Sequence, residues 1–178
     1  MKRRTIKIEE KLTDEYVNRL MDKFTQLATK DDEKEITLLF GDTSEGGVMD
    51  SVRTFIFLIE SSGVPVRTRN TGQIYSAASL LFLAGGKRDG TIGSRISFHP
   101  FTVNSNGIRI DYVNKDLAIY GREIKRQFIL ISKYIQRRVP LLSKKAIREF
   151  FNAPEYVYVE FDDAVKCGIL TESVPVKV

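Results

Sequence analysis

The sequence has only one cysteine, one histidine and no tryptophan among its 178 residues. With Cys167 alone, an internal disulfide is excluded, which favours a reducing compartment. A metal site built from several histidines and cysteines is nearly excluded as well, so we expect neither a metal nor a cofactor. Any acid–base mechanism that needs an imidazole near neutral pH must use His99.

Long apolar runs are also absent. The longest, around Leu80–Leu83, is soon broken by Gly85, Gly86 and Lys87, whereas a membrane span needs about 20 apolar residues. The opening MKRRTIKIEE has no apolar stretch after its charges, unlike a secretory signal. These features predict a cytoplasmic protein without a membrane partner.

The chain is basic, with a net charge of +5 and a pI near 9.3, which raises the question of nucleic-acid binding. The densest basic stretch, Arg122–Arg148, alternates charges with apolar positions, as solvated helix faces do. Recognised nucleic-acid motifs are lacking. We therefore expect no nucleic-acid partner.

Periodicity predicts one α/β domain over residues 1–178, because no repeat, low-complexity tract or linker divides the chain. In the first half, strands and helices alternate as in βαβ units, and the second half is mostly helical. The expected strands are Arg4–Ile8, Ile36–Phe40, Val64–Arg69, Arg95–Phe98 and Val157–Phe161. The expected helices begin near Asp14, Asp50, Ala77, Asp111, Ser143 and Asp162. Gly72–Ser76 is expected to be a turn and Phe101–Gly107 a polar loop.

Three segments are candidates for chemistry, and the first is Gly46–Gly47, which follows the apolar strand Ile36–Phe40 closely. A glycine turn of this kind can direct backbone N–H groups at a developing oxyanion. Gly pairs are also common as plain strand–helix turns. The local sequence leaves both interpretations open.

The second segment, GQIYSAAS, places Ser76 after a tight turn and before a helix of small residues. A serine at a helix mouth is well placed as a nucleophile, because the free N–H groups there stabilise negative charge. Ser76 can equally serve as an ordinary helix cap. Ser79, one turn later, is a rival nucleophile on nearly the same face.

The third segment, SRISFHP, ends a short strand at His99. An imidazole at a strand end can lean toward a neighbouring helix N-terminus and act as a base. A lone histidine is more often structural, but the helix-opening serine upstream favours the catalytic interpretation.

Together these pieces resemble the proteolytic subunit of the Clp protease. The family's Ser-Pro-Gly-Gly turn, Gly-x-Ala-Ala-Ser-Met elbow, Ala-Gly-x-Lys-Arg segment and strand ending in histidine have counterparts in the same order. These are Ser44–Gly47 (with Glu45 in place of Pro), Gly72–Ala77, Ala84–Arg88 and Ser94–Pro100. Later, DLAIYGREI and DDAVKCGIL resemble the family's helix after the histidine and its closing motif.

The resemblance implies a ClpP/crotonase-like fold, a repeated ββα superhelix with a protruding handle helix, the handle region covering about 100–138. It implies a serine endopeptidase in which Ser76 attacks the substrate, His99 takes its proton, and the N–H groups of Gly47 and Ala77 form the oxyanion hole. Peptides would be cut inside a homo-oligomeric chamber of two stacked seven-membered rings, with Phe101–Tyr112 as a contact region and an AAA+ unfoldase as partner.

The family's third catalytic residue, an aspartate, has no clean counterpart. One alignment places it at Phe150 and another at Asn152, with Glu149 and Glu155 nearby. Asn152 is our first candidate, because an amide oxygen can orient an imidazole; Glu149 or no third member are the alternatives. A catalytically silent subunit that assembles with an active partner is the second functional hypothesis. The crotonase branch, which acts on acyl-CoA, is a third, but the serine and strand-end histidine are not its pattern.

Overall fold

The computed structural model describes residues 4–30, 34–41, 46–99, 102–105, 108–111, 118–153 and 155–172. The chain divides into two compact units, one formed by residues 1–97 with 159–178 and the other by residues 98–158. Each unit is described by itself. The single domain expected over residues 1–178 stays a prediction, since a division into compact units does not test it.

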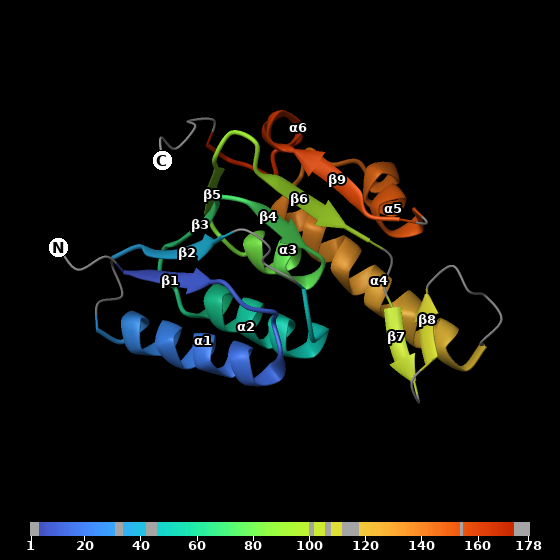
Figure 1. Cartoon of the computed structure of the whole chain (residues 1–178), viewed down its shortest axis with the longest axis horizontal. Coiled ribbons are helices and arrows are strands. Elements are labelled where there is room, and N and C mark those ends of the chain that lie inside the picture. Colours follow the sequence, from blue (N-terminus) through green and yellow to red (C-terminus); the bar gives the residue numbers. More distant parts are fainter. Residues whose placement is uncertain are drawn as a thin grey trace. The chain divides into compact units, whose positions relative to one another are not determined.

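The first unit is built on a parallel sheet in the order β1-β2-β3-β5 (Figure 1). Its strands are Thr5–Ile8, Ile36–Phe40, Val66–Asn70 and Lys87–Gly90. Each neighbouring pair runs parallel, so the connections must cross over, as the alternation of strands and helices predicted. The first three strands confirm the sequence prediction, whereas β5 was not predicted.

Helices α1 (Asp14–Ala28) and α2 (Met49–Ser61) lie side by side against one face of this sheet (Figure 1). Thr13 caps α1 by accepting a hydrogen bond from the Tyr16 N–H at 3.2 Å. Phe24 of α1 meets Phe55 of α2 edge-on, with ring centroids 5.8 Å apart. Burial of such side chains contributes about 1.5–3 kcal/mol each, which fixes both helices on the sheet.

A second sheet has the order β4-β6-β9, formed by Gln73–Tyr75, Arg95–Phe98 and Val157–Glu160. Strands β4 and β6 are parallel, with Tyr75 opposite Ser97. The short helices α3 (Ala77–Phe82) and α6 (Phe161–Lys166) follow β4 and β9. The prediction that Gly72–Ser76 is only a turn was therefore wrong, because Gln73–Tyr75 finds a partner strand distant in sequence.

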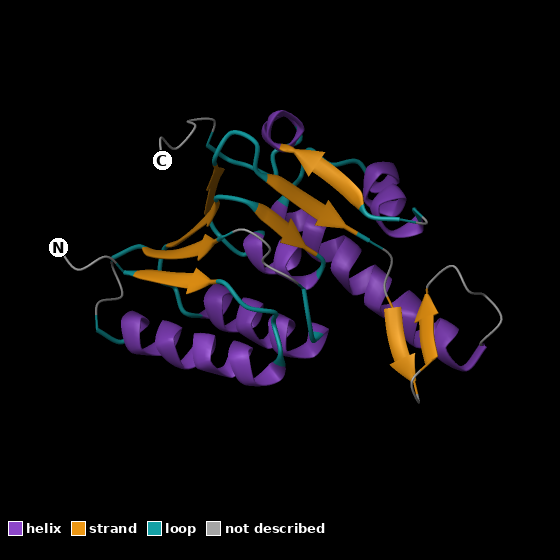
Figure 2. Cartoon of the chain, in the orientation of Figure 1, coloured by secondary structure: helices purple, strands orange, loops and turns teal. Residues whose placement is uncertain are grey.

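In the second unit, the described residues include a hairpin and the helices α4 and α5 (Figure 2). Strands β7 (Thr102–Ser105) and β8 (Ile108–Asp111) pair antiparallel, which corrects the expected polar loop at Phe101–Gly107 for its described residues. Pairing satisfies the backbone of these polar residues despite their composition. Helix α4 runs from Ala118 to Arg138 and α5 from Lys144 to Asn152.

An aromatic cluster holds α5 within this unit. Phe98 stacks on Phe150 with centroids 4.8 Å apart and planes 5° from parallel. Phe151 meets both Phe98 and Phe128 edge-on. Ser143 caps α5 by accepting from the Ala146 N–H at 3.1 Å, as predicted. Because Phe98 directly precedes His99, the cluster fixes the strand end that carries the imidazole.

The mixed helices and strands confirm the α/β class. The ββα superhelix and the handle helix stay predictions. Pro100, Phe101 and Tyr112, with residues 113–117 of the handle region, lie outside the described residues, as do Ser44 and Glu45 of the predicted turn.

Candidate active site

Ser76 stands between strand β4 and helix α3 in a backbone conformation that L-residues rarely adopt. Its φ is 55° and its ψ is −125°, and among the described residues it is the single non-glycine with positive φ. Such strain costs of the order of 1–3 kcal/mol and gathers at functional sites. The Ser76 side chain makes no capping hydrogen bond to α3, so the alternative of a plain helix cap was wrong.

The backbone of Gly46 lies directly against this serine. A Cβ built on Gly46 would come 2.7 Å from the Ser76 Oγ and 2.7 Å from the Ala77 N, and closer still to the Ser76 Cβ. Real Cβ atoms do not approach other atoms so closely, so only glycine fits. The turn after β2 and the start of α3, which are 30 residues apart in sequence, therefore meet at the Ser76 side chain.

The backbone of Gly47 packs closely against that of Leu12. A Cβ there would collide with the Leu12 carbonyl group, whose oxygen accepts a hydrogen bond from the Val48 N–H at 3.0 Å. Neither the Gly47 N–H nor the Ala77 N–H donates a hydrogen bond to any residue that the structure describes. Both N–H groups are chemically suited to donate hydrogen bonds to an anion.

Ser79, the rival nucleophile, is occupied in the core. Its side chain is fully buried, and its Oγ donates to the Ser97 carbonyl oxygen at 2.7 Å. The same Ser97 oxygen accepts from the Ser76 N–H at 3.3 Å. Ser79 thus ties α3 to strand β6 and supports the conformation of Ser76, a role that its position on the helix did not reveal.

His99 lies in the second unit, where its ring packs against Tyr156. The ring centroids are 4.8 Å apart and the planes are inclined by 55°. Tyr156 in turn stacks on Tyr158, at 6.2 Å and 30°. Sequence reasoning missed Tyr156; the available signal was the alternation Tyr-Val-Tyr, which places both rings on one face of a strand.

The three candidate positions for the third catalytic residue lie in different surroundings. Asn152, the last residue of α5, is exposed, and its side chain bonds to no residue within the described ranges. Glu149 is exposed and pairs with Lys145 at 3.9 Å. Phe150 is only 8% exposed and belongs to the aromatic cluster, so it cannot orient an imidazole through a polar atom.

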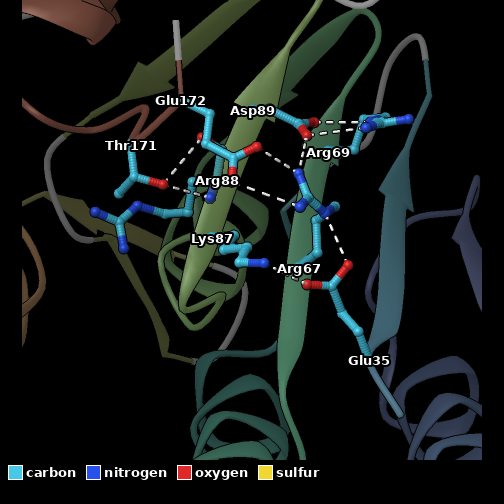
Figure 3. Close-up of polar contacts among 8 residues, drawn as sticks. All are labelled: Glu35, Arg67, Arg69, Lys87, Arg88, Asp89, Thr171 and Glu172. Atoms are coloured by element: carbon cyan, nitrogen blue, oxygen red, sulfur yellow. Dashed lines mark hydrogen bonds and ion pairs between the residues drawn. The ribbon is translucent and has the colours of Figure 1, made fainter. Parts of the chain in front are cut away.

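A second polar cluster, which was not predicted, spans the sheet of the first unit (Figure 3). Arg67 of β3 donates to Asp89 of β5 at 2.6 Å, to Glu172 at 2.6 Å and to Glu35 at 2.9 Å. Arg69 binds both oxygens of Asp89, at 2.7 and 2.9 Å. The Asp89 side chain is only 2% exposed, so its charge is stable there because two guanidinium groups face it.

The pKa values of this cluster shift accordingly. Burial opposes ionisation of Asp89, but hydrogen bonds from Arg69 and Arg67 outweigh it and hold the pKa of the carboxyl below its ordinary value. Burial likewise disfavours the charged form of Arg67, yet its bonds to Glu172, Glu35 and Asp89 raise its pKa. The pKa shifts of Asp89, Arg67 and Arg69 all favour their charged forms, which gives this cluster a structural rather than a proton-transfer role.

Arg88, next to Asp89, fastens the C-terminal segment to the sheet. Its buried guanidinium donates to the carbonyl oxygens of Ile169, Gly168 and Gly85 at 2.6, 3.0 and 3.0 Å. The Arg88 carbonyl oxygen accepts from the Thr171 and Glu172 N–H groups. Residues 168–172 thereby complete the first unit.

Other reactive groups offer no rival centre. Burial raises the pKa of the Cys167 thiol, which lowers its thiolate fraction and its nucleophilicity near pH 7. In the described ranges, three or more His, Cys, Asp or Glu side chains nowhere gather as a metal site would require. Nor does any helix there combine the length and apolar character needed to cross a bilayer.

An α/β protein with a serine held at positive φ on a strand-to-helix turn has the local geometry of a hydrolase nucleophile elbow. The sequence matches the Clp protease family over residues 1–172. The chain therefore belongs to the Clp protease family, which confirms the resemblance found in the sequence. No curated protein matches it.

Proposed function

We propose that this chain is a serine endopeptidase subunit of the Clp type, with Ser76 as nucleophile and His99 as general base. The observation that carries the proposal is the positive φ of Ser76 beside the close-packed backbone of Gly46. A strained turn of this kind costs stability, and a catalytic role for its hydroxyl accounts for that cost. Membership of the family supplies independent support.

In the proposed reaction, the Ser76 Oγ bonds to the carbonyl carbon of the scissile peptide while the His99 imidazole takes the hydroxyl proton. The N–H groups of Gly47 and Ala77 bind the oxyanion, each donor being worth about 2.7–4 kcal/mol in the transition state. His99 then gives its proton to the leaving amine as the C–N bond breaks. Water, deprotonated by the same imidazole, hydrolyses the acyl ester and restores Ser76.

Ser76 belongs to the first unit and His99 to the second. The proposal that they act together is supported by strand register: Tyr75 lies opposite Ser97, and each catalytic candidate follows its strand within two residues. Asn152 as the third member stays a prediction, as do the stacked heptameric rings, the AAA+ unfoldase, the peptide substrates and the cytoplasmic location.

The test is covalent labelling with a fluorophosphonate probe, read by intact mass spectrometry. Wild type is expected to gain one adduct per chain, Ser76→Ala none, and His99→Gln an adduct at a rate at least 100-fold lower. Circular dichroism should match among the three proteins. Equal labelling of wild type and Ser76→Ala would exclude Ser76 as the nucleophile.

The second candidate function is a catalytically silent subunit that assembles with an active partner. This function is favoured by the surroundings of the candidates for the third catalytic residue. Asn152 is exposed, Glu149 pairs with Lys145, and Phe150 is in the core. Loss of the orienting carboxylate costs about 10⁴ in rate in serine proteases. A folded wild type that assembles into rings in native mass spectrometry yet never reacts with the probe would select this alternative.

A further inference from the structure

Within the second unit, helices α4 and α5 enclose an open groove of about 480 Å³. Its lining residues are Phe128, Ile129, Ser132, Lys133, Gln136, Arg137, Lys144, Ile147 and Arg148. This volume falls within the range of small-molecule sites, about 300–1,000 Å³. None of these residues belongs to the candidate active site.

The body of the groove is apolar. Phe128 and Ile129 contribute from α4, and Ile147 contributes from α5. Ile129 leaves 43% of its surface exposed, which costs free energy unless a ligand covers it. The groove is also held in shape, because the Gln136 side-chain amide donates to the Leu142 carbonyl oxygen at 3.0 Å and so ties α4 to the turn before α5.

Positive charges surround this apolar body. Lys133, Lys144 and Arg148 are exposed and form no ion pair with any acidic residue in the described part of the chain. Lys145, by contrast, points to Glu149 and is absent from the groove. The rim therefore has uncompensated charge of one sign, which complements an anion.

One polar atom in the wall lacks a partner. The Ser132 Oγ is buried and makes no hydrogen bond to the residues that the structure describes. An unpaired buried hydroxyl is destabilising, and such groups are rare unless a ligand or water satisfies them. A carboxylate entering the groove would accept this hydrogen bond.

We propose that the α4–α5 groove binds a medium-chain fatty carboxylate, with its alkyl chain along Phe128, Ile129 and Ile147. Its carboxylate accepts from the Ser132 hydroxyl and faces the lysines of the rim. A peptide fits less well, because its backbone N–H and C=O groups would enter an apolar wall that cannot satisfy them. A fatty carboxylate brings one anionic head and an otherwise apolar body.

The experiment is isothermal titration calorimetry of decanoate into the full chain at low salt. A dissociation constant of roughly 0.1–1 mM is expected from the size of the ligand. Butyrate, with the same charge and a short chain, and decyltrimethylammonium, with the opposite charge, are expected to bind at least tenfold more weakly. Higher salt should weaken decanoate binding.

Two matched pairs of variants localise the site. Lys133→Gln/Lys144→Gln removes one rim charge from each helix and should weaken decanoate about five- to tenfold, whereas Lys125→Gln/Lys145→Gln, which removes charges outside the groove, should not. Ile129→Ser should weaken it about tenfold and Leu130→Ser, on the same helix but not in the lining, less than twofold. Ser132→Ala should raise the melting temperature while weakening decanoate.

Several outcomes would overturn the proposal. Absence of decanoate binding, equal binding of butyrate, or equal effects within either matched pair would each do so. An acidic amphipathic peptide that binds where decanoate does not would reassign the groove to a protein segment. Self-association that Ile129→Ser abolishes, without any binding of decanoate, would reassign it to a second copy of the chain.

Discussion

The ring of His99 packs against the ring of Tyr156, with centroids 4.8 Å apart and planes inclined by 55°. The two residues are joined within one unit, where Phe98, directly before His99, stacks on Phe150. Aromatic packing thus constrains both the His99 ring and the residue directly before it in the chain. The aromatic contact with Tyr156 therefore restricts the orientations open to the His99 ring.

This relationship predicts that Tyr156→Ala lowers the rate of fluorophosphonate labelling about three- to tenfold, the equivalent of an aromatic pair worth about 0.5–1.5 kcal/mol. Tyr156→Phe keeps the ring and should restore the rate. Tyr158→Ala, which removes the outer ring, is the control; an equal loss there would indicate a general structural effect.

Gly46→Ala should reduce labelling at least 100-fold. The added Cβ would overlap the Ser76 side chain and the Ala77 N, so the nucleophile and an oxyanion donor would both move from their positions. Gly41→Ala is matched to it, because a Cβ at Gly41 meets nothing within 4 Å. Comparable rates for the two alanine variants would argue against a reactive site at this turn.

Ser79→Ala distinguishes the two serines of α3. Loss of its buried hydrogen bond to Ser97 should lower the free energy of unfolding by about 1 kcal/mol, measured by urea denaturation. Labelling should persist within about threefold of wild type, because Ser79 does not carry the reactive hydroxyl. Complete loss of labelling in a folded Ser79→Ala protein would instead favour Ser79 as the nucleophile.

The Arg67–Asp89 cluster predicts a specific acid sensitivity. The pKa of Asp89 is lowered in the folded protein, so its stabilising contribution is complete above the unfolded value of about 3.9 and is lost as pH falls through the folded value. Asp89→Asn should cost about 2–3 kcal/mol at pH 7 and flatten the fall in stability below pH 4. Glu15→Gln, at an exposed ion pair with Arg19, should leave both the stability and its pH dependence unchanged.

Arg88→Met should loosen the C-terminal segment. It removes the donors for the Ile169, Gly168 and Gly85 carbonyl oxygens, at a cost of roughly 1–3 kcal/mol for each buried acceptor left without a partner. Hydrogen exchange at the Thr171 and Glu172 amides should accelerate. Lys87→Met, next in sequence but 57% exposed, should leave this exchange unchanged; retained protection in Arg88→Met would show that the segment is held by other contacts.

Local periodicity predicted most helices and the buried strands well, because an amphipathic helix such as α1 and an apolar strand such as β2 record their environment in their own residues. Strands β4 and β5 were missed for the opposite reason. Gln73–Tyr75 is only three residues long, and Lys87–Gly90 is polar; each becomes a strand through pairing with a distant segment. The hairpin of β7 and β8 is a further case. The helix start expected near Asp111 was wrong, because Asp111 ends strand β8 and α4 begins at Ala118.

For the candidate site, the sequence identified the serine, the histidine and the glycine turn. It could not reveal the φ of Ser76 or the position of Gly46 against it, since both depend on how separate segments pack. The Arg67–Asp89 cluster was missed because contacts between side chains far apart in the chain leave no local pattern, whereas the only local signal for Tyr156 was the alternation Tyr-Val-Tyr. The basic stretch around Lys133 was interpreted as a solvated face, and its groove appears only when α5 closes it.

The bond between Arg67 and Glu172 joins residues separated by 105 positions, so it forms only when two segments far apart in the sequence have come together. Until residues 168–172 reach the sheet, Arg67 lacks its Glu172 acceptor and Arg88 lacks the Ile169 and Gly168 carbonyl oxygens. Such late, long-range closure slows folding and exposes incomplete intermediates to aggregation. A truncation that removes Glu172 would therefore leave Arg67 without one of its carboxylate acceptors.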